Sequence, residues 1–375
     1  MVSDNKGFLH PFIHKDKCVE CGLCDGVCEH VNQPVKKAPL KIVALKHWDD
    51  VVRSTSSSGG AFMLMASEII NRGGVVYGAV FDDSWEVRHR RCTDSQGLKE
   101  MQGSKYVQSN LDNSFRHVEQ DLRNGIIVLF TGTPCQCGGL KEYLKLRKAD
   151  DENLFLCDLI CHGIPSPLVW GDYVKYRSEN KKLAVGGGIN FRDKRKSWRD
   201  FRMCLTYSDE SSCTYRQNED FFFIMFFHHL ILRESCFECK FTSLDRVSDI
   251  TIGDFWGLEE SYPEFDDDRG TSVMLLNSDK GLTLFDSVKD NCFHISITKE
   301  ALTKRQPNLR RPSPPNPKYE LFWDDYKKMS FNEILKRYAD RTAWGIFKRK
   351  YLFKFLYYTR MFPILVSLKK MFLNE

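Results

Sequence analysis

Four closely spaced cysteines near the N-terminus constrain this chain more than any other feature. Cys18, Cys21, Cys24 and Cys28 follow the pattern C-x2-C-x2-C-x3-C. Bacterial ferredoxins hold a 4Fe–4S cluster with this spacing. A zinc site more often shows two separated C-x2-C pairs, and a disulfide framework does not need cysteines this close together. The N-terminal cysteine run (residues 18–28) therefore predicts an iron–sulfur cluster, with a zinc knuckle as the alternative.

The run corresponds to half of a larger motif. In two-cluster ferredoxins the fourth cysteine of each run ligates the other cluster, so that two runs are needed. This chain has one run, and Glu29 stands where a proline usually follows the fourth cysteine. Residues 7–11 resemble the link between the two halves of such a module. We therefore expect either an upstream start or a single cluster with an improvised fourth ligand in place of Cys28.

Composition places the chain among globular proteins of a reducing compartment. A chain of 375 residues is long enough for two or three domains with hydrophobic cores. Because 42% of the residues are hydrophobic, the chain is expected to be globular. The net charge of +5 is too small to indicate a nucleic-acid partner. Because residues 1–30 are polar and rich in cysteine, we expect no signal peptide, and because no run of about 18 apolar residues occurs, we expect no membrane span. Because 14 cysteines occur without a secretory signal, we expect a cytoplasmic protein that uses them for metal ligation, not disulfides.

The order of strands, loops and helices predicts an α/β fold with a mixed sheet, next to a small ferredoxin-like module. We expect three parts: a ferredoxin-like module at 1–40, a flavin and iron–sulfur domain at 41–310, and a proline linker with a helical tail at 311–375. Strands are expected at 41–46, 75–81, 86–92, 125–130, 154–160, 249–254 and 272–276, with further antiparallel strands within 188–215. Helices are expected at 61–70, 111–123, 137–147, 167–178, 221–232 and 279–290.

The tail is aromatic and basic, with cationic and apolar residues alternating in blocks over 347–358. One interpretation is a helix that makes weak contact with a membrane surface. The other is a helix packed on protein, which we favour because Pro363 interrupts the pattern and long amphipathic helices more often pack on protein.

Four dispersed cysteines form a second candidate site. Cys135 and Cys161 each follow a predicted strand, and Cys236 and Cys239 form a C-x2-C pair. The carboxyl ends of parallel strands meet at one edge of a sheet, where open α/β sheets bind ligands. The second cysteine set (Cys135, Cys161, Cys236 and Cys239) could therefore hold another 4Fe–4S cluster or a zinc ion. The alternative is four buried cysteines that act as small hydrophobic residues.

Two loops suit a phosphate or a flavin. The serine–glycine loop (residues 56–60) precedes a predicted helix, whose first N–H groups can bind an anion. The Gly103 loop (residues 103–108) offers a lysine, a hydroxyl and an aromatic ring. A helix cap is the simpler interpretation of the first loop, and no G-x-G-x-x-G pattern supports nicotinamide binding. The cofactor-binding candidates in these loops are Ser57, Ser58, Gly59, Gly60, Gly103, Ser104, Lys105, Tyr106 and Gln108.

Six motifs together resemble the coenzyme F420 hydrogenase/dehydrogenase beta-subunit family, over about residues 1–310. They lie at residues 58–60 (SGG), 103–106 (GSKY), 132–136 (GTPCQ), 161–163 (CHG), 236–239 (C-x2-C) and 249–257 (DITIGDFWG). The resemblance implies FAD and one or two 4Fe–4S clusters. It adds Gly132 and Thr133 to the flavin site, and it favours the second cysteine set as a cluster site.

The resemblance also implies an activity. Electrons would enter from ferredoxin or another redox partner at the N-terminal cysteine run, pass through the second cysteine set to FAD, and reach a small organic acceptor. Many family members with an N-terminal ferredoxin piece resemble proteins found beside bacterial polysaccharide genes, so the resemblance also implies a tie to polysaccharide biosynthesis. The alternatives are an electron-relay subunit without its own substrate and a zinc-stabilised binding protein. His162 is the candidate proton donor, with a structural role beside Cys161 as its alternative.

Overall fold

The computed structural model describes residues 1–28, 31 and 34–339. The chain divides into two compact units. Unit 1 combines Met1–Thr214 with Leu232–Pro314, and unit 2 combines Tyr215–Ile231 with Pro315–Glu375. Most of the expected tail helix, from residue 340 onward, lies outside the described residues.

A mixed sheet forms the centre of unit 1, and within the described residues it has eight strands in the order β13-β3-β12-β11-β7-β6-β4-β5. The inner strands β11, β7, β6 and β4 are parallel to one another. The outer pairings, β4 with β5, β11 with β12, and β3 with both β12 and β13, are antiparallel. The strand bounds are β3 Lys41–His47, β4 Val75–Phe81, β5 Val87–Cys92, β6 Val128–Gly132, β7 Leu154–Leu159, β11 Ile250–Asp254, β12 Ser272–Leu276 and β13 Cys292–Ser296.

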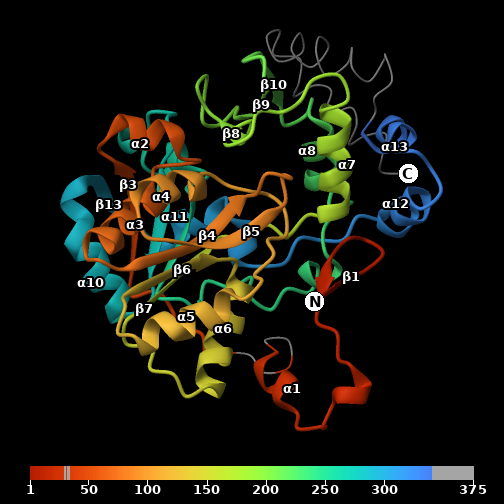
Figure 1. Ribbon diagram of the computed structural model, residues 1–375. Helices are drawn as coiled ribbons and strands as arrows, with labels where there is room; N and C mark the ends of the chain where they lie inside the picture. Colours follow the sequence, from red (N-terminus) through yellow and green to blue (C-terminus); the bar gives the residue numbers. More distant parts are fainter. Residues whose placement is uncertain (29–30, 32–33, 340–375) are drawn as a thin grey trace, which may run out of the picture. The chain divides into compact units, whose positions relative to one another are not determined.

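Helices cover both faces of this sheet (Figure 1). Because side chains alternate along a strand, Val76 and Val80 of β4 pack with α3, α4 and α10, whereas Val75 and Tyr77 pack with α5 and α6. The expected α/β fold with a mixed sheet is therefore confirmed. The helix bounds are α1 Leu23–Val27, α2 Asp50–Thr55, α3 Ala61–Asn71, α4 Ser95–Met101, α5 Ser114–Arg123, α6 Pro134–Leu146, α7 Pro167–Arg177, α8 Phe221–Phe227, α9 Leu258–Ser261, α10 Asp279–Val288, α11 Lys299–Lys304, α12 Tyr319–Tyr326 and α13 Phe331–Tyr338.

One strand begins later than the sequence predicts. The apolar run 125–130 predicts extended backbone, but β6 spans Val128–Gly132. Gly125, at φ +72°, instead ends α5: its N–H donates to Leu122 O, and the N–H of Ile126 donates to Asp121 O. This is the Schellman pattern of a helix C-terminus, which uses the first two residues of the apolar run.

Helix α8 of unit 2 ends earlier than predicted. The apolar run 221–232 suggests one helix, but α8 stops at Phe227. His229 has φ +57°, its N–H donates to Phe226 O, and the N–H of Leu230 donates to Met225 O. The same termination pattern therefore occurs here with a histidine in the left-handed conformation, which sequence reasoning did not anticipate.

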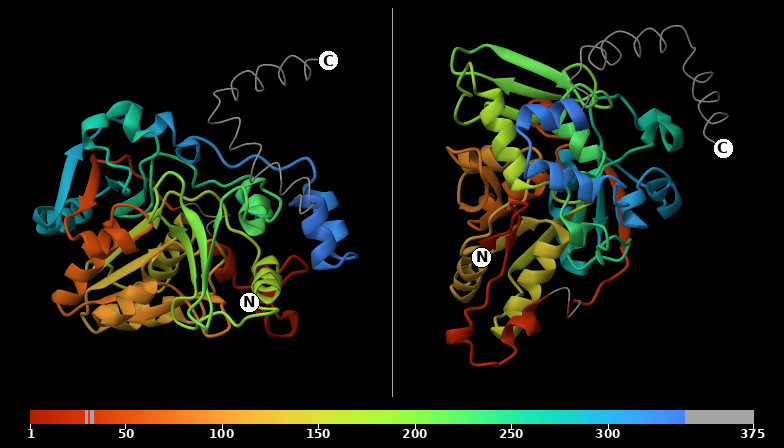
Figure 2. Two further views of the ribbon diagram at one scale, coloured as in Figure 1. Left: turned by 90° about the horizontal axis from the view of Figure 1, so that it is seen from above. Right: turned by 90° about the vertical axis from the view of Figure 1, so that its right-hand side faces the viewer.

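The N-terminal part of unit 1 is mostly irregular. Strands β1 (Val2–Ser3) and β2 (Leu9–His10) pair, and the cysteine run follows as a loop with the single turn α1. Figures 1 and 2 show this loop in red on the outside of unit 1. A second sheet, in the order β10-β9-β8, contains β8 Ile189–Asp193, β9 Arg202–Thr206 and β10 Ser212–Arg216. In the described part of the chain, no helix has the length and apolar character to cross a membrane.

Candidate functional site

The parallel strands bring several predicted site residues to one edge of the sheet. Strand β6 ends at Gly132 and leads into α6, which contains Cys135 in its first turn. Strand β7 is the parallel neighbour of β6, and Cys161 follows its end. We call the edge at the C-terminal ends of β4, β6, β7 and β11 the cofactor edge. Open α/β sheets bind ligands at such an edge.

The structure brings the second cysteine set together. Cys161 is close enough to Cys236, Cys135 and Cys239 for each of them to raise the pKa of its thiol. Gly163 makes this approach feasible, because a Cβ there would lie 2.9 Å from Leu232 Cδ1 and 3.4 Å from Cys236 Cβ. Cys161 therefore lies near the three other cysteines of the second set.

Burial dominates the chemistry of these thiols. Burial raises the pKa of Cys161 well above its ordinary value and that of Cys236 to about 12. Backbone N–H groups oppose this effect, because that of Gly163 bonds to Cys161 and that of Ile164 bonds to Cys236. N–H bonds to sulfur are one means by which proteins adjust iron–sulfur clusters. A positively charged group is needed to hold several such sulfurs as thiolates.

Among residues 1–28, 31 and 34–339, no three His, Cys, Asp or Glu side chains converge tightly enough to bind one metal ion. In a 4Fe–4S cubane each thiolate binds a different iron, so the sulfurs stand further apart than around one zinc ion.

The N-terminal cysteine run is much more accessible. Cys18, Cys21 and Cys24 are exposed and Cys28 is half-buried. Helix α1 lies beside α6, the helix that contains Cys135. Downstream of the run, Lys37 N donates to Arg246 O and Arg246 N donates to Lys37 O, each at 2.8 Å. The segment that follows the N-terminal cysteine run is thus paired with the segment that follows Cys239.

The two predicted anion-binding loops touch each other. The hydroxyl of Ser57 accepts a hydrogen bond from Ser104 N at 2.8 Å, and the side chain of Gln102 donates to Ser56 Oγ at 2.8 Å. The serine–glycine loop is also fixed to the sheet, because Ser58 Oγ donates to Thr271 O and Gly59 N donates to Ser272 Oγ. Both loops therefore lie at the cofactor edge, where β12 begins beside the end of β11.

A chain of polar contacts connects this region to the Gly132 loop (residues 132–136). Gln136 Nε2 donates to Ser109 Oγ, just after the Gly103 loop, and Gln136 Oε1 accepts from Thr133 N. Thr133 Oγ1 lies 3.1 Å from Cys135 Sγ. His89 completes the chain through Ser109 Oγ at 2.9 Å and Thr131 O at 2.9 Å. These contacts join the Gly132 loop and one cysteine of the second set to Ser109, the residue directly after the Gly103 loop.

Two predicted site residues have structural partners. The ammonium of Lys105 donates to four carbonyl oxygens at the end of α4, those of residues 100–103, at 2.8–3.2 Å. It caps that helix end, where a cation is favourable. His162 Nδ1 lies 3.4 Å from Asn308 Oδ1, and its carbonyl accepts from Ser313 Oγ at 2.7 Å. Tyr106 contacts Arg192, and Gln108 contacts Leu9.

Sequence reasoning missed a buried polar group beside these loops. Arg192 of β8 forms two hydrogen bonds to Asp254 at 2.9 and 3.0 Å, and it also reaches Tyr106 Oη at 3.2 Å and Ser57 O at 3.4 Å. Trp198 Nε1 donates to the same carboxylate at 3.2 Å. Asp254 lies in the quoted motif at 249–257, which marked its importance, but no local pattern in the sequence indicates Arg192.

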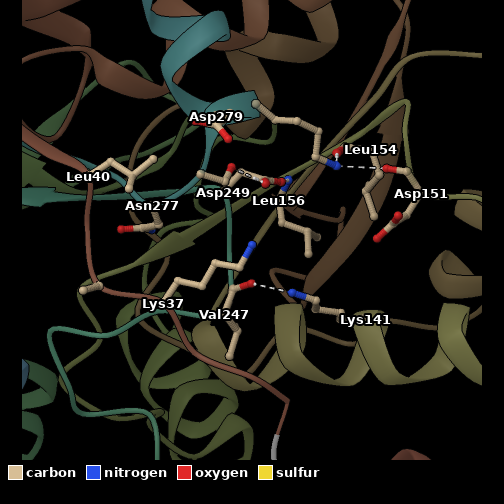
Figure 3. Close-up of a pocket in the computed structure, with 13 residues that line it drawn as sticks. Lys37, Leu40, Lys141, Asp151, Leu154, Leu156, Val247, Asp249, Asn277 and Asp279 are labelled. Atoms are coloured by element: carbon tan, nitrogen blue, oxygen red, sulfur yellow. Dashed lines mark hydrogen bonds between the residues drawn. The ribbon is translucent and has the colours of Figure 1, made fainter.

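The larger of two described cavities lies at the opposite edge of the sheet (Figure 3). It measures about 470 Å³ and is lined by residues at the beginnings of β7 and β11. Its polar groups already serve the fold: Lys280 donates to Leu154 O at 2.7 Å, and Asp249 accepts from Leu156 N at 2.9 Å. The second cavity, of about 310 Å³, lies between residues 4–10 and 233–235. Neither is lined by the three predicted flavin loops.

Comparison with known proteins agrees with the fold. Residues 127–300 match the family that is described as the C terminus of the coenzyme F420 hydrogenase/dehydrogenase beta subunit. A chain of the F420-reducing NiFe hydrogenase complex from Methanosarcina barkeri, solved with xenon derivatization, is similar with a TM-score of 0.50 and 16% sequence identity. The similarity covers 73% of this chain and 88% of that one. No curated protein matches the chain.

The family match and the fold indicate a redox subunit of the hydrogenase/dehydrogenase beta-subunit type. More specifically, the part of the chain that spans residues 127–300 matches the C-terminal domain of the coenzyme F420 hydrogenase/dehydrogenase beta subunit. This domain contains all four cysteines of the second set and the Gly132 loop. Proteins of this family typically bind iron–sulfur clusters, and the donor set described above suits one.

Proposed function

We propose that the protein is an FAD- and iron–sulfur-dependent oxidoreductase that passes electrons from a reduced partner, through 4Fe–4S clusters and the flavin, to an organic two-electron acceptor. A flavin supplies the exchange between one-electron and two-electron chemistry. The observation that carries this proposal is the polar network at the cofactor edge. The contact from Ser104 to Ser57 joins the first two loops. The contacts from Gln136 to Ser109 and from Thr133 to Cys135 connect the Gly132 loop to the segment directly after the Gly103 loop and to the second cysteine set.

The residues of the chain have defined tasks in this account. The second cysteine set would supply the thiolates of one cluster, and the N–H groups of Gly163 and Ile164 would stabilise the negative charge on two of them. Burial of these thiols would exclude water from the cluster. The serine–glycine loop and the N-terminus of α3 would bind the phosphate of the flavin, because helix N–H groups favour an anion.

The N-terminal cysteine run fits the role of electron entry. Three of its four cysteines are exposed, so a ferredoxin or another reduced partner can approach them. The pairing of Lys37 with Arg246 fixes the segment after this run to the segment after Cys239. A cluster in the run would therefore be tied to the second cysteine set, which is a suitable arrangement for transfer between the two.

A relay subunit without its own substrate is the second candidate function. The similar chain from Methanosarcina barkeri is part of a hydrogenase complex. Both candidates require clusters, and they differ in whether the protein acts alone on an acceptor.

Anaerobic purification followed by quantification of iron, sulfide and flavin tests the proposal. Bound flavin together with iron and sulfide supports it, whereas a colourless, zinc-loaded protein contradicts both candidates. Reduced ferredoxin is then mixed with the loaded protein and a set of artificial two-electron acceptors. Turnover of an acceptor by the purified chain alone supports the enzyme. If the flavin is reduced but an acceptor is turned over only after a partner protein is added, the result supports the relay subunit.

A further inference from the structure

The loop that contains the N-terminal cysteine run projects from unit 1 and is attached to it on both sides (Figure 1). Before the loop, Phe8 is buried, and Leu9 N donates to Gln108 Oε1 at 2.9 Å. After the loop, Lys37 and Arg246 exchange backbone hydrogen bonds of 2.8 Å. The described residues between these attachments therefore have a defined base on unit 1, and they present their side chains outward.

Apolar side chains are exposed along this loop. Of the 18 large hydrophobic side chains that are exposed in the described part of the chain, six lie between residues 12 and 35. These six residues, which we call the apolar loop surface, are Phe12, Ile13, Val19, Leu23, Val31 and Val35. Their exposed fractions range from 53% to 81%. Exposed apolar side chains that gather in one segment indicate an interaction surface.

The charges of the loop favour a partner that is similar to the loop itself. From residue 11 to residue 28 the loop contains two lysines and three acidic residues, Lys15, Lys17, Asp16, Glu20 and Asp25. A strongly acidic or strongly basic partner would find no opposite charge of matching strength there. A second copy of the chain would instead meet a nearly neutral, apolar surface without repulsion.

The ligands of the run also require a second run. Cys18 and Cys21 precede α1, and Cys24 lies in the first turn of this helix. Cys28 follows the end of α1. In two-cluster ferredoxins the fourth cysteine of such a run ligates the cluster of the other run. Because this sequence contains one run, two copies of the chain would supply the pair of runs that the pattern needs.

We infer that two copies of this chain associate through the apolar loop surface, and that each copy donates Cys28 to the cluster bound by the first three cysteines of the other copy's run. The same residues meet across a two-fold axis, so one contact completes both clusters. The inference rests on the proposed cluster in the N-terminal cysteine run and adds the partner that completes it. Cys28 serves as a ligand, and no electron or proton transfer is assigned to it.

Complementation between two defective variants tests the exchange of ligands. One variant carries Cys28→Ser, and the other carries serine in place of the first three cysteines of the run, which are exposed and can be replaced without damage to the fold. The two variants carry different affinity tags, so that the mixed dimer can be isolated after anaerobic cluster reconstitution. Iron is counted as the excess over a variant in which all four cysteines of the run are serine.

The mixed dimer should hold about four iron atoms in excess that resist a chelator, and each variant alone should hold none. A mixture of Cys28→Ser with the variant that lacks all four cysteines is the matched control and should also hold none. Chelator-resistant iron in Cys28→Ser alone would contradict the inference. So would a mixture of the two defective variants that gains no iron while the wild type binds it.

The oligomeric state shows what covers the apolar loop surface. Light scattering of the anaerobic, cluster-loaded wild type should give twice the mass of one chain. Ile13→Glu should halve this mass, because the contact would bury a charge without a partner. Val185→Glu is the matched control, since Val185 is 58% exposed outside the loop, and this variant should remain dimeric. A dimeric Ile13→Glu variant, or a monomeric wild type that binds ferredoxin through Ile13, would contradict the inference.

The same measurements separate this inference from the proposed function. A monomeric wild type with excess iron in the run refutes the shared clusters and keeps the N-terminal cluster. A wild type without excess iron refutes both the cluster in the run and its completion by a second copy. Neither result affects the assignment of the second cysteine set.

Discussion

Arg246 and Asp158 form an ion pair that is almost completely buried behind the second cysteine set. The guanidinium Nη2 lies 2.8 Å from Asp158 Oδ1, and the two side chains are 2% and 0% exposed. The same guanidinium donates to the carbonyls of Phe241 and Ser243, so it fastens the segment after Cys239 to β7. The position of the C-x2-C pair therefore depends on one arginine.

Removal of this arginine should damage both stability and cluster binding. Arg246→Met leaves the Asp158 carboxylate buried without a partner, which should lower the free energy of unfolding by about 3–5 kcal/mol. Iron content should fall as well, because the Cys236–Cys239 segment loses its anchor. Urea denaturation and iron analysis measure the two effects. Lys181→Met breaks an exposed pair with Asp209 and serves as the control, with neither quantity changed. Unchanged stability in Arg246→Met would contradict the anchoring role.

Single cysteine substitutions should separate ligands from other thiols. Cys236→Ser should lose the iron of the second cysteine set and keep that of the N-terminal cysteine run, because serine is a poor cluster ligand. Cys213→Ser, at an exposed position of β10, should retain all iron. Iron analysis of anaerobically purified variants measures this difference. Full iron content in Cys236→Ser would remove this residue from the ligand set.

Acid should destabilise the protein through His89. Burial lowers the pKa of His89 from 6.5 to about 4, so between these pH values the unfolded chain binds a proton that the folded chain does not. Above pH 6.5 the neutral His89 does not reduce the free energy of unfolding. As the pH falls from 6.5 to about 4, the free energy of unfolding decreases by about 3 kcal/mol because of this residue.

Denaturation at several pH values should therefore give a shallower decline for His89→Gln than for the wild type. The exposed His117→Gln variant should follow the wild type. Parallel curves for the wild type and His89→Gln would show that His89 is not held neutral.

Two glycines should respond to alanine in opposite directions. Gly125 ends α5 at φ +72°, so Gly125→Ala should cost about 1 kcal/mol from backbone strain alone, since no atom lies within 4 Å of the added Cβ. Gly171 lies inside α7 with equally open surroundings, and Gly171→Ala should gain about 0.5–1 kcal/mol. Unfolding midpoints of the two variants measure the difference. A stabilising Gly125→Ala substitution would contradict the helix stop described for α5.

The sequence was sufficient to predict the α/β layers, because apolar strands such as 154–160 and glycine-bounded helices such as 61–70 have strong local patterns. It also suggested that Cys135 and Cys161 would converge, since both follow parallel strands. The predicted end of α8 was wrong because a histidine occupies the left-handed position where glycine is the usual signal.

The polar interior of the site was much less predictable. Arg192 pairs with Asp254 across 62 residues of sequence, and Lys194 reaches Ser58 across 136, so neither contact has a local signature. Lys105 had the appearance of a ligand-binding lysine, but its ammonium caps α4. Long-range pairing of charged side chains is decided by tertiary packing, which periodicity and motif spacing do not report.

The most direct test of the account isolates the second cysteine set. A variant with Cys18, Cys21, Cys24 and Cys28 all changed to serine is purified anaerobically, analysed for iron and sulfide, and examined by electron paramagnetic resonance after reduction. The account predicts about four iron and four sulfide per chain and the signal of a reduced 4Fe–4S cluster. A variant that folds but contains no iron, or only zinc, would contradict a cluster at Cys135, Cys161, Cys236 and Cys239.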